Sequence, residues 1–411
     1  MSSATTEDVK EIATAQAKEH LRRFLESNSL LELPRSTVPR LSILLVLYNR
    51  AELTLACLRS IQPRLAEIGA EVILVDNASR DETGTLLDRL SGAQVIRNRD
   101  NRGFPVAVNQ AAEAATGEFL LLLNNDTEVL GDSLGIALRF LEANPDVGAV
   151  GGRILLLDGT LQEAGCTFWR DGHAFQYGRG DDPTAAEYQF QRDVDYCSAA
   201  FLMTRRALFT QMGGLDTAFS PGYFEDSDYC IRLWRAGWRV VYLPEVAILH
   251  YENASAASSQ DSRALYQRNL PYFTQKHADW LAHQCPFGTP PWLMRGSHDE
   301  RFCVLYLPKQ TNGQTPEWSR VVHELRSRNC FVTVYPINVG SAVVPPPLPS
   351  VEEGKGGPRL PADVEVLPGG SLDSLPRFLA ERRYYYDGML ASDREILAQL
   401  EQWLRQDEQT R

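Results

Sequence analysis

The sequence predicts an α/β protein whose main domain has a mostly parallel central sheet with helices on both faces, together with a smaller C-terminal α/β domain. Three apolar runs, LSILLVLYN, EVILVDNAS and QVIRN, end in polar or turn-forming residues, and a fourth run, LLLNNDTEV, follows. Helical patterns separate these runs. The alternation over about residues 41–123 requires crossover connections, which place parallel strands beneath helices.

Each helix of this alternation is indicated by its spacing or by a stop signal. One helix face is formed by Leu53, Ala56, Cys57, Ser60 and Ile61. A second helix is expected at residues 83–90. A third is expected at residues 104–116, and Gly117 is a typical helix terminator.

The fourth apolar run delivers Asp126 at its carboxyl end, after Asn124 and Asn125. Ligands bind at this edge of α/β sheets. A carboxylate there suits a divalent cation that bridges to phosphate. Taken alone, the run is better explained as a solvated turn that closes a buried strand, and it is the neighbouring motifs that favour a ligand site.

The second run ends in Asp76 and Asn77, followed by Ser79 and Asp81. A carboxylate and an amide at that edge can hydrogen-bond a flat heterocycle such as uracil or thymine. Asn77 or Ser79 ahead of Glu82 could equally cap the next helix. Both interpretations stay open from the residues alone.

Two further features lie downstream. Residues 223–228, YFEDSD, open a helix that runs to Gly237, and its acidic first turn could simply complement the helix dipole, with Asp226 or Asp228 as a cap. His250 closes the strand VAILH. A single histidine at a strand end is more often a surface or satisfied residue than a ligand.

Four segments in this order resemble the inverting family 2 glycosyltransferases of the GT-A fold, of the rhamnosyltransferase and O-antigen polysaccharide type. They are LSILLVLYNR, VDNASRDET, NRDNRGFPVAVNQAAEAATGEFLLLLNND and GYFEDSDYCIRLWRAGWRVVYLPEVAILHY, and they span about residues 40–275. The resemblance implies a nucleotide-sugar site that includes Tyr48, Asn49, Arg50, Asp76, Asn77, Arg102, Gly103, Asn109, Asn124 and Asn125.

The resemblance also implies the catalytic groups. Asp126 matches the last carboxylate of the family's Asp-x-Asp motif, and His250 would complete a manganese or magnesium site that carries the leaving charge. Asn124 replaces the first carboxylate, so one anionic contact is missing. Asp226, ahead of Glu225, would take the acceptor proton as the acceptor oxygen attacks the anomeric carbon.

The implied function is inverting transfer of a sugar from a UDP or dTDP donor to a polysaccharide, glycoconjugate or lipid-linked glycan. A nucleotidyltransferase is the alternative enzyme. Such an enzyme requires a Gly-rich phosphate loop with Arg or Lys after the first strand, whereas this chain has LYNRAEL there. A degenerate nucleotide-sugar-binding scaffold is favoured by Asn124. The joint presence of Asp76, Asp126, Asp226 and His250 argues against it.

The expected domains follow from changes in composition. Residues 1–39 form an N-terminal amphipathic helix and linker, 40–286 the GT-A domain, 287–299 a linker and 300–411 a Rossmann-like domain. The helix at residues 6–27 has apolar residues at helical spacing and is expected to pack on the enzyme or a partner subunit. The C-terminal pattern resembles the amino-terminal half of a GT-B enzyme, so the chain is either a fragment of a longer transferase or carries a binding or assembly domain.

Composition bounds the partners and the location. The formal charge of −12 argues against a nucleic-acid partner. Seven cysteines at irregular positions predict neither a disulfide framework nor a metal motif. No apolar stretch reaches the roughly 20 residues of a membrane span. We expect a cytoplasmic protein, with peripheral association at the inner face of the membrane as the alternative.

Overall fold

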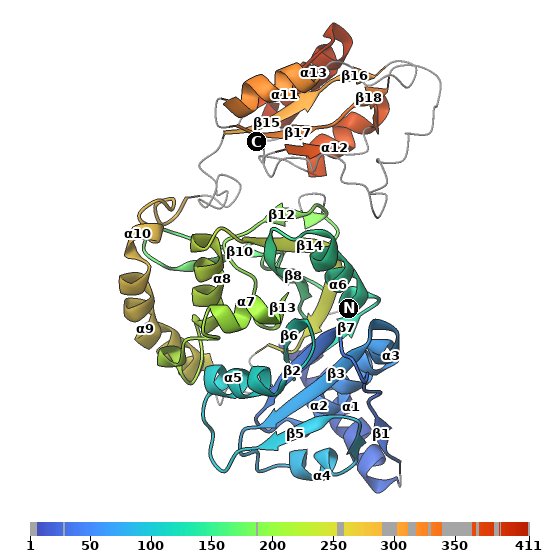
Figure 1. Cartoon of the computed structure of the whole chain (residues 1–411). Coiled ribbons are helices and arrows are strands. Elements are labelled where there is room, and N and C mark those ends of the chain that lie inside the picture. The colour runs from blue at the N-terminus through green and yellow to red at the C-terminus, as the bar shows by residue number, and fades with distance from the viewer. Residues whose placement is uncertain are drawn as a thin grey trace. The chain divides into compact units, whose positions relative to one another are not determined.

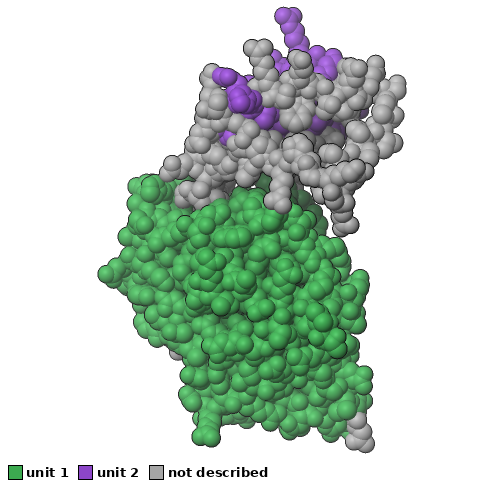
Figure 2. Space-filling model, viewed as in Figure 1, with its two compact units in different colours: residues 1–298 green, residues 299–411 purple. Residues whose placement is uncertain are grey.

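The computed structural model divides the chain into two compact units, residues 1–298 and 299–411 (Figure 2). Each unit has its own sheet. The structure describes residues 6–27, 29–185, 188–252, 259–289, 302–310, 318–327, 330–338, 364–366, 370–381, 386 and 388–409.

The first unit is built on a ten-stranded sheet (Figure 1). Eight of its strands follow one another in hydrogen-bonded order: β12 (Arg192–Asp193), β14 (Arg239–His250), β8 (Val147–Leu155), β13 (Phe201–Arg205), β6 (Phe119–Asn124), β2 (Leu41–Leu47), β3 (Ala70–Asp76) and β5 (Gln94–Arg97). Strand β7 (Thr127–Leu130) pairs with β14, and β9 (Leu161–Glu163) pairs with β8.

The sheet is mixed but mostly parallel, as predicted. Strands β5, β3, β2 and β6 pair in parallel, and β14 pairs in parallel with β8. Strand β13 is antiparallel to both β6 and β8, so these two strands share one direction. The intervening helices α2 (Ala51–Ile61), α4 (Thr83–Leu87) and α5 (Phe104–Ala114) confirm the predicted alternation.

Apolar residues cover both faces of the sheet, which explains why its strands read as continuous apolar runs. In β2, Ile43 and Leu45 belong to the core that also contains residues of α2, whereas Leu44 belongs to the opposite core beneath α5. All three side chains are at most 1% exposed. The sheet is therefore a central layer between two helical layers.

The N-terminal segment packs on this unit. Helix α1 (Thr6–Glu26) buries Ala17, Leu21 and Phe24, while Ile12 of the predicted apolar stripe is exposed. Strand β1 (Leu31–Glu32) pairs in parallel with β4 (Leu90–Ser91). The amphipathic helix therefore packs on the first unit itself, as expected.

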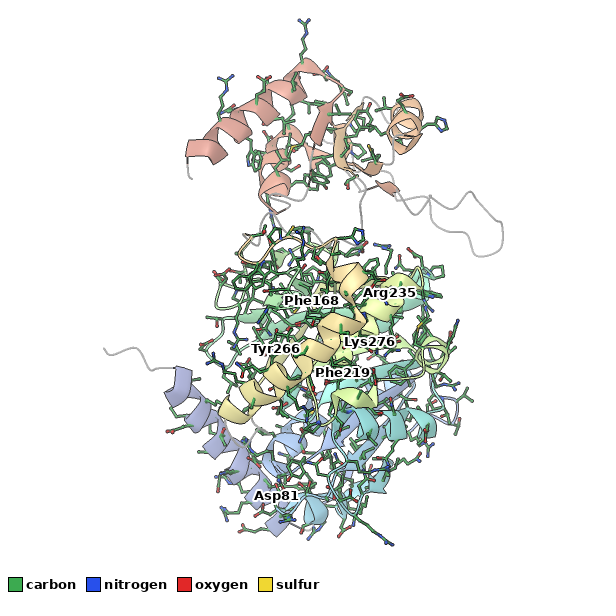
Figure 3. All side chains as sticks on the ribbon, turned by 90° about the vertical axis from the view of Figure 1, so that its left-hand side faces the viewer. Asp81, Phe168, Phe219, Arg235, Tyr266 and Lys276 are labelled. Atoms are coloured by element: carbon green, nitrogen blue, oxygen red, sulfur yellow. The ribbon has the colours of Figure 1, made fainter. Side chains whose placement is uncertain are left out.

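The chain after β6 supplies the remaining elements of this unit. They are α6 (Ser133–Ala143), the hairpin β10 (Cys166–Phe168) and β11 (Ala174–Gln176), α7 (Arg206–Gln211), α8 (Glu225–Arg235), α9 (Ser259–Lys276) and α10 (Ala278–Leu281), with short helical segments η1 (Gln62–Arg64), α3 (Leu65–Ile68) and η3 (Thr217–Phe219). Figure 3 shows α9 crossing the unit, with Tyr266 and Lys276 on it and Phe219 beside it.

The second unit has a four-stranded parallel sheet in the order β19 (Val364–Val366), β17 (Cys330–Val334), β15 (Phe302–Leu307) and β21 (Gly388–Ala391). Its helices are α11 (Trp318–Ser327), α12 (Leu375–Glu381) and α13 (Arg394–Gln409), and a second sheet contains β16 (Lys309–Gln310), β18 (Ile337–Asn338) and β20 (Gly370–Ser371), followed by η5 (Leu372–Ser374). Strands and helices alternate here, as expected for the smaller C-terminal α/β domain.

Six cysteines are free thiols: Cys57, Cys166, Cys197, Cys230, Cys285 and Cys330. None of the helices in the described part of the chain is both long and apolar enough to cross a membrane.

The buried carboxylate of Glu71 connects β3 to β2 and to the segment that precedes β6. Glu71 is 1% exposed. Its Oε1 accepts hydrogen bonds from the Ser42 hydroxyl at 2.7 Å and from the Thr116 backbone N–H at 2.7 Å, and Arg35 pairs with its Oε2 at 3.0 Å. Burial alone would raise the pKa of Glu71, but the bonds from Thr116 and Ser42 outweigh it and lower the pKa.

We predict that Glu71→Gln lowers the free energy of unfolding by roughly 1.5–3 kcal/mol at pH 7, because hydrogen bonds to a charged group are lost. A lowered pKa gives stability that is complete above the unfolded-state pKa and lost as pH falls through the folded-state pKa. The difference between wild type and variant should therefore shrink in acid. Urea unfolding measures it, and Glu67→Gln, at an exposed i,i+3 pair with Arg64, should change stability by only about 0.5 kcal/mol or less.

Candidate active site

A cavity of about 810 Å³ opens at the carboxyl ends of β2 and β6. Val46 and Tyr48 line it from β2 and the turn after it, and Asn124 from the end of β6. Its opposite walls come from β9, from the hairpin β10–β11 and from the start of α8. This is the sheet edge at which the sequence predicts ligand binding.

The turns after β2 and β3 are tied together by hydrogen bonds. The Asn49 backbone N–H donates to the Ser79 hydroxyl at 2.8 Å, and the Ser79 N–H donates to Asp76 Oδ1 at 3.0 Å. Asn49 and Arg50 have left-handed backbone conformations, with φ of 58° and 60°. Asp76 is 8% exposed, so this carboxylate is held in a formed turn rather than in solvent.

Asp81, and not Asn77 or Ser79, serves the nearby helix starts. Its Oδ2 accepts from the Ala51 N–H at 2.9 Å at the start of α2, and its Oδ1 accepts from the Thr83 N–H at 3.0 Å at the start of α4. The alternative in which Asn77 or Ser79 caps α4 is therefore not observed. The Ser79 hydroxyl instead accepts a hydrogen bond from the Asn49 backbone N–H.

Asn77 holds the loop that precedes α5. Its Oδ1 accepts from the Arg102 N–H at 3.0 Å, and its Nδ2 donates to Asn101 Oδ1 at 2.8 Å. Gly103 has φ of 82°, and a Cβ at this position would lie 2.8 Å from Pro221 Cα. Only glycine lets this loop approach the segment before α8 so closely.

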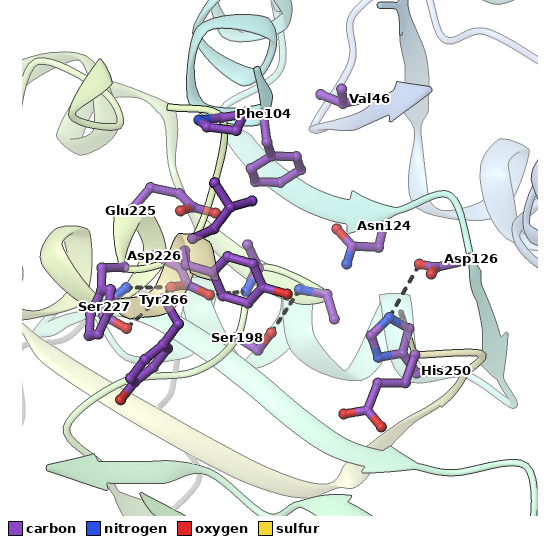
Figure 4. A pocket seen from close by; sticks show the side chains of 18 of the residues that line it. Val46, Phe104, Asn124, Asp126, Ser198, Glu225, Asp226, Ser227, His250 and Tyr266 are labelled. Atoms are coloured by element: carbon purple, nitrogen blue, oxygen red, sulfur yellow. Dashed lines mark hydrogen bonds and ion pairs between the residues drawn. The ribbon is translucent and has the colours of Figure 1, made fainter. Parts of the chain in front are cut away.

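The predicted metal ligands meet at one end of the cavity. His250 Nε2 lies 3.2 Å from Asp126 Oδ1, and both residues are buried (Figure 4). His250 Nδ1 lies 2.7 Å from Gln162 Oε1, which fixes the ring and directs Nε2 towards Asp126. Burial opposes protonation of His250, but the Asp126 carboxylate outweighs it and raises the histidine pKa.

This donor set fits a divalent cation in combination with substrate oxygens. A carboxylate and an imidazole suit manganese, and one or two carboxylates plus phosphates are usual for magnesium. No group of three or more His, Cys, Asp or Glu side chains arranged to hold a metal occurs among the described residues. Substrate or water would have to supply the remaining ligands.

The acidic pair Glu225 and Asp226 lies at the opposite end of the cavity (Figure 4). Asp226 Oδ2 accepts from the Ala199 N–H at 3.0 Å, and Oδ1 accepts from the Ser227 N–H at 2.7 Å. These hydrogen bonds lower the pKa of Asp226, but burial has the larger effect and raises it. Burial, followed by the charge of Asp226, raises the pKa of Glu225 to about 8, and Glu225 Oε2 is buried without a hydrogen-bond partner.

The loop that leads into this pair is held by a residue that sequence reasoning missed. Asn269 of α9 is 4% exposed, and its Nδ2 donates to the carbonyl oxygens of Phe219 at 2.9 Å, Gly222 at 2.9 Å and Tyr223 at 3.1 Å. Tyr223 and Phe224 both have left-handed conformations, with φ of 76° and 75°. One buried amide therefore fixes an unusual backbone directly before Glu225.

Two further buried carboxylates, Asp228 and Asp195, have structural partners. Asp228 binds Arg232 at 2.8 Å, Lys276 at 2.6 Å and His277 at 2.8 Å. Asp195 is fully buried, and its Oδ2 accepts from the Phe168 N–H at 2.9 Å. Both carboxylates thus stabilise the walls of the cavity.

The structure brings most of the predicted site residues to one cavity. Those that line it are Tyr48, Asn77, Gly103, Asn124, Asn125, Asp126, Glu225, Asp226 and His250. Asn49, Arg50, Asp76, Arg102 and Asn109 are not among the lining residues. Asn109 exchanges two hydrogen bonds with the backbone of Leu215, at 2.8 and 2.9 Å, so it joins α5 to the turn after α7.

Sequence reasoning also missed several residues of the far wall, among them Gln162, Glu163, Gln176 and Arg179. Glu163 is 1% exposed, and burial raises its pKa. Gln162, Glu163 and Gln176 lie in strands of only three residues, and Arg179 lies in the turn after β11, so no periodic pattern marks them. The proximity of Gln162 to His250 depends on pairing across 88 residues of sequence.

Residues 42–211 match the model of glycosyl transferase family 2. An O-antigen biosynthesis protein of Myxococcus xanthus is 30% identical over 57% of this chain and 19% of its own length. An N-acetylglucosaminyl-diphospho-decaprenol L-rhamnosyltransferase of Mycobacterium tuberculosis is 27% identical over 55% of this chain and 80% of its own length.

The mannosyltransferase PcManGT of Pyrobaculum calidifontis, solved in complex with GDP-Man and Mn²⁺, aligns with 67% of this chain and 73% of its own, at 21% identity and a TM-score of 0.42. The chain spans less than a third of the length of its longer curated relatives. The family match ends at residue 211, so the likeness of residues 300–411 to half of a GT-B enzyme stays a prediction. Residues 42–211 of this chain are thus similar to a glycosyl transferase family 2 domain.

Proposed function

We propose that the chain is an inverting, metal-dependent glycosyltransferase with a GT-A domain, which transfers a sugar from a UDP or dTDP donor to a polysaccharide or lipid-linked glycan. The observation that carries this proposal is that one cavity at the sheet edge contains both the Asp126–His250 pair and the buried Glu225–Asp226 pair. The names of the Myxococcus and Mycobacterium relatives support this class of acceptor.

The donor nucleotide would bind at the strand-end turns. Asp76 would contact the base, with Asn49 and Arg50 near the base and ribose, and Asn77 and Gly103 shaping the loop beneath the donor. These turns are already joined by hydrogen bonds, so little ordering is needed when the nucleotide binds. Tyr48, Asn124 and Asn125 would lie between this region and the metal ligands.

A divalent cation would be held by Asp126 and His250, and when bound it would neutralise negative charge on the donor diphosphate. Gln162 holds the His250 ring in the orientation that presents Nε2. Asn124 would offer the cation a neutral oxygen, whereas the carboxylate that it replaces would offer a negatively charged one. The chain thus offers one carboxylate, in Asp126, and one imidazole, in His250, to such a cation.

Asp226 would act as the general base. Its carboxylate receives hydrogen bonds from the Ala199 and Ser227 amides, which favour the charged form. Glu225 Oε2 has no hydrogen-bond partner, and burial together with the charge of Asp226 raises the pKa of Glu225, which disfavours its charged form. A single base that activates the acceptor for one direct displacement gives inversion at the anomeric carbon.

The proposal is tested with the full chain and a panel of UDP and dTDP sugars in the presence of Mn²⁺ or Mg²⁺. Donor hydrolysis or transfer is measured, and NMR gives the anomeric configuration of the product. Turnover with inversion is expected. Nucleotide binding without turnover of any donor would instead indicate a degenerate binding scaffold.

For the metal site, we predict that Asp126→Ala abolishes the Mn²⁺-dependent part of UDP or dTDP affinity and that His250→Ala weakens it. Each substitution removes one of the two protein donors. Calorimetric titration with and without Mn²⁺ measures the effect. His283→Ala, at an exposed histidine, is the control and should keep the wild-type metal dependence. Unchanged metal dependence in both site variants contradicts the assignment.

For the base, Asp226→Asn should reduce kcat by about 100- to 10,000-fold with little change in donor affinity, because proton removal occurs only in the transition state. Glu225→Gln should keep much of the activity. In wild type, kcat should fall with decreasing pH around a pKa above the usual range of Asp, because burial raises the pKa of Asp226. An active Asp226→Asn beside an inactive Glu225→Gln would move the role by one residue.

For the loop, Asn269→Asp should lower kcat while leaving the Kd of the donor nucleotide near wild type. The substitution keeps the size but turns the donor amide, which faces three carbonyl oxygens, into an acceptor. Unfolding free energy should fall by about 1–3 kcal/mol. Asn144→Asp is the matched control, because the Asn144 amide caps the end of α6 by donating to Phe140 O at 2.8 Å. Equal loss of kcat in both variants would argue against a positioning role.

A further inference from the structure

The walls of the cavity are strongly acidic. Among the described residues that line it, five carry carboxyl groups: Asp126, Glu163, Glu225, Asp226 and Glu252. Arg179 is the one lining residue in these regions that carries an arginine or lysine charge. Arg179 is therefore the arginine that this wall offers to a ligand with several negative charges.

Arg179 follows the hairpin strand β11 and is linked to the segment that carries His250. Its Nη1 donates to Gln176 Oε1 at 2.8 Å, and its Nη2 donates to Glu252 Oε2 at 2.9 Å. Glu252 lies two residues after His250, and its charge contributes to the raised pKa of His250. The guanidinium is thus held near the end of the cavity where Asp126 and His250 meet.

The ion pair between Arg179 and Glu252 can be broken at a low cost in free energy. The two side chains are 43% and 26% exposed, and ion pairs at this exposure are worth about 1 kcal/mol or less. A guanidinium presents planar paired donors that match phosphate oxygens, and such bidentate pairs are among the stronger hydrogen bonds. A diphosphate can therefore replace the Glu252 carboxylate as the partner of Arg179.

We propose that Arg179 is a phosphate-binding residue that holds the diphosphate group of the bound nucleotide, and that Glu252 pairs with its guanidinium before the ligand binds. This inference rests on the proposed function, which brings a nucleotide diphosphate into the cavity. Arg179 then offsets negative charge that the Asp126–His250 site, with the neutral Asn124 beside it, leaves on the ligand.

The test compares charged and uncharged probes on the full chain with saturating Mn²⁺. Calorimetry gives the affinities of UDP and dTDP, and of uridine and thymidine, for wild type and for Arg179→Met. The variant should bind the diphosphates about 10- to 100-fold more weakly, since bonds to charged groups are lost, and the nucleosides equally well. Arg179→Lys should recover part of the loss, because it restores the charge without the planar pair of donors.

Two further variants separate a local contact from general electrostatics. Arg139→Met removes an equal charge from an exposed ion pair with Asp132 on α6 and should leave all affinities unchanged. Glu252→Gln releases Arg179 from its partner and should tighten diphosphate binding. Thermal unfolding confirms that each variant is folded.

The outcomes separate this inference from the function on which it rests. Equal weakening of nucleoside and diphosphate binding by Arg179→Met, or no weakening of either, overturns the role of Arg179 while leaving the donor class intact. Weaker diphosphate binding by Glu252→Gln also overturns it. A wild-type chain that binds neither UDP nor dTDP overturns the proposed donor class, and the role of Arg179 with it.

Discussion

Strand β13 is the constraint on which the site depends. It runs antiparallel between β6 and β8, with Phe201 opposite Leu123 and Met203 opposite Val150. The turn just before it therefore lies at the end of β6, where the Asn124 N–H donates to Ala200 O at 3.3 Å. The next amide back along this turn, the Ala199 N–H, binds Asp226. One strand thus fixes the distance between Asn124, at the end of β6, and the Asp226 carboxylate.

The sequence predicted the local elements well and the long-range assembly poorly. Strands β2, β3, β5 and β6 and the helices between them were predictable, because each apolar run and each helix face is a local pattern with a clear stop. The antiparallel insertion of β13 has no such signal. Its place depends on pairing with β6 and β8, and the paired residues are separated by more than 50 positions in the sequence. Element type is local, whereas strand order is decided by the packing of the whole sheet.

The same distinction applies to the site. The strand-end residues Asn124 and Asp126, which line the cavity, were predictable, because the end of a strand can be read from the sequence. Gln162, Arg179 and Asn269 were not, because each acts through a partner remote in sequence: His250, Glu252 and the loop before α8. The resemblance to a family supplied motif residues, but supporting residues require the tertiary structure. The alternative that Asn77 or Ser79 caps α4 was wrong for a related reason. Asp81 accepts hydrogen bonds from backbone N–H groups at the starts of both α2 and α4, and α2 is remote in sequence.

The loop before α8 shows how packing maintains a backbone that local preference would avoid. Non-glycine residues in left-handed conformations cost of order 1–3 kcal/mol each, and Tyr223 and Phe224 are two in succession. Three hydrogen bonds from Asn269 oppose this cost. Aromatic contacts of Phe224 with Tyr266 and Phe273, at centroid distances of 4.7 and 4.6 Å, oppose it as well.

All of these contacts come from α9, so this helix, which follows His250 in the chain, determines where α8 begins. The conformation that they maintain places Glu225 and Asp226 in the first turn of α8, facing the cavity, where the backbone amides of Ala199 and Ser227 hold the Asp226 carboxylate. The position of a buried acidic pair is thereby set by a helix that contributes neither carboxylate. Substitutions on the inner face of α9 should therefore displace Glu225 and Asp226, while the turns at the ends of β2 and β3 keep their own hydrogen bonds.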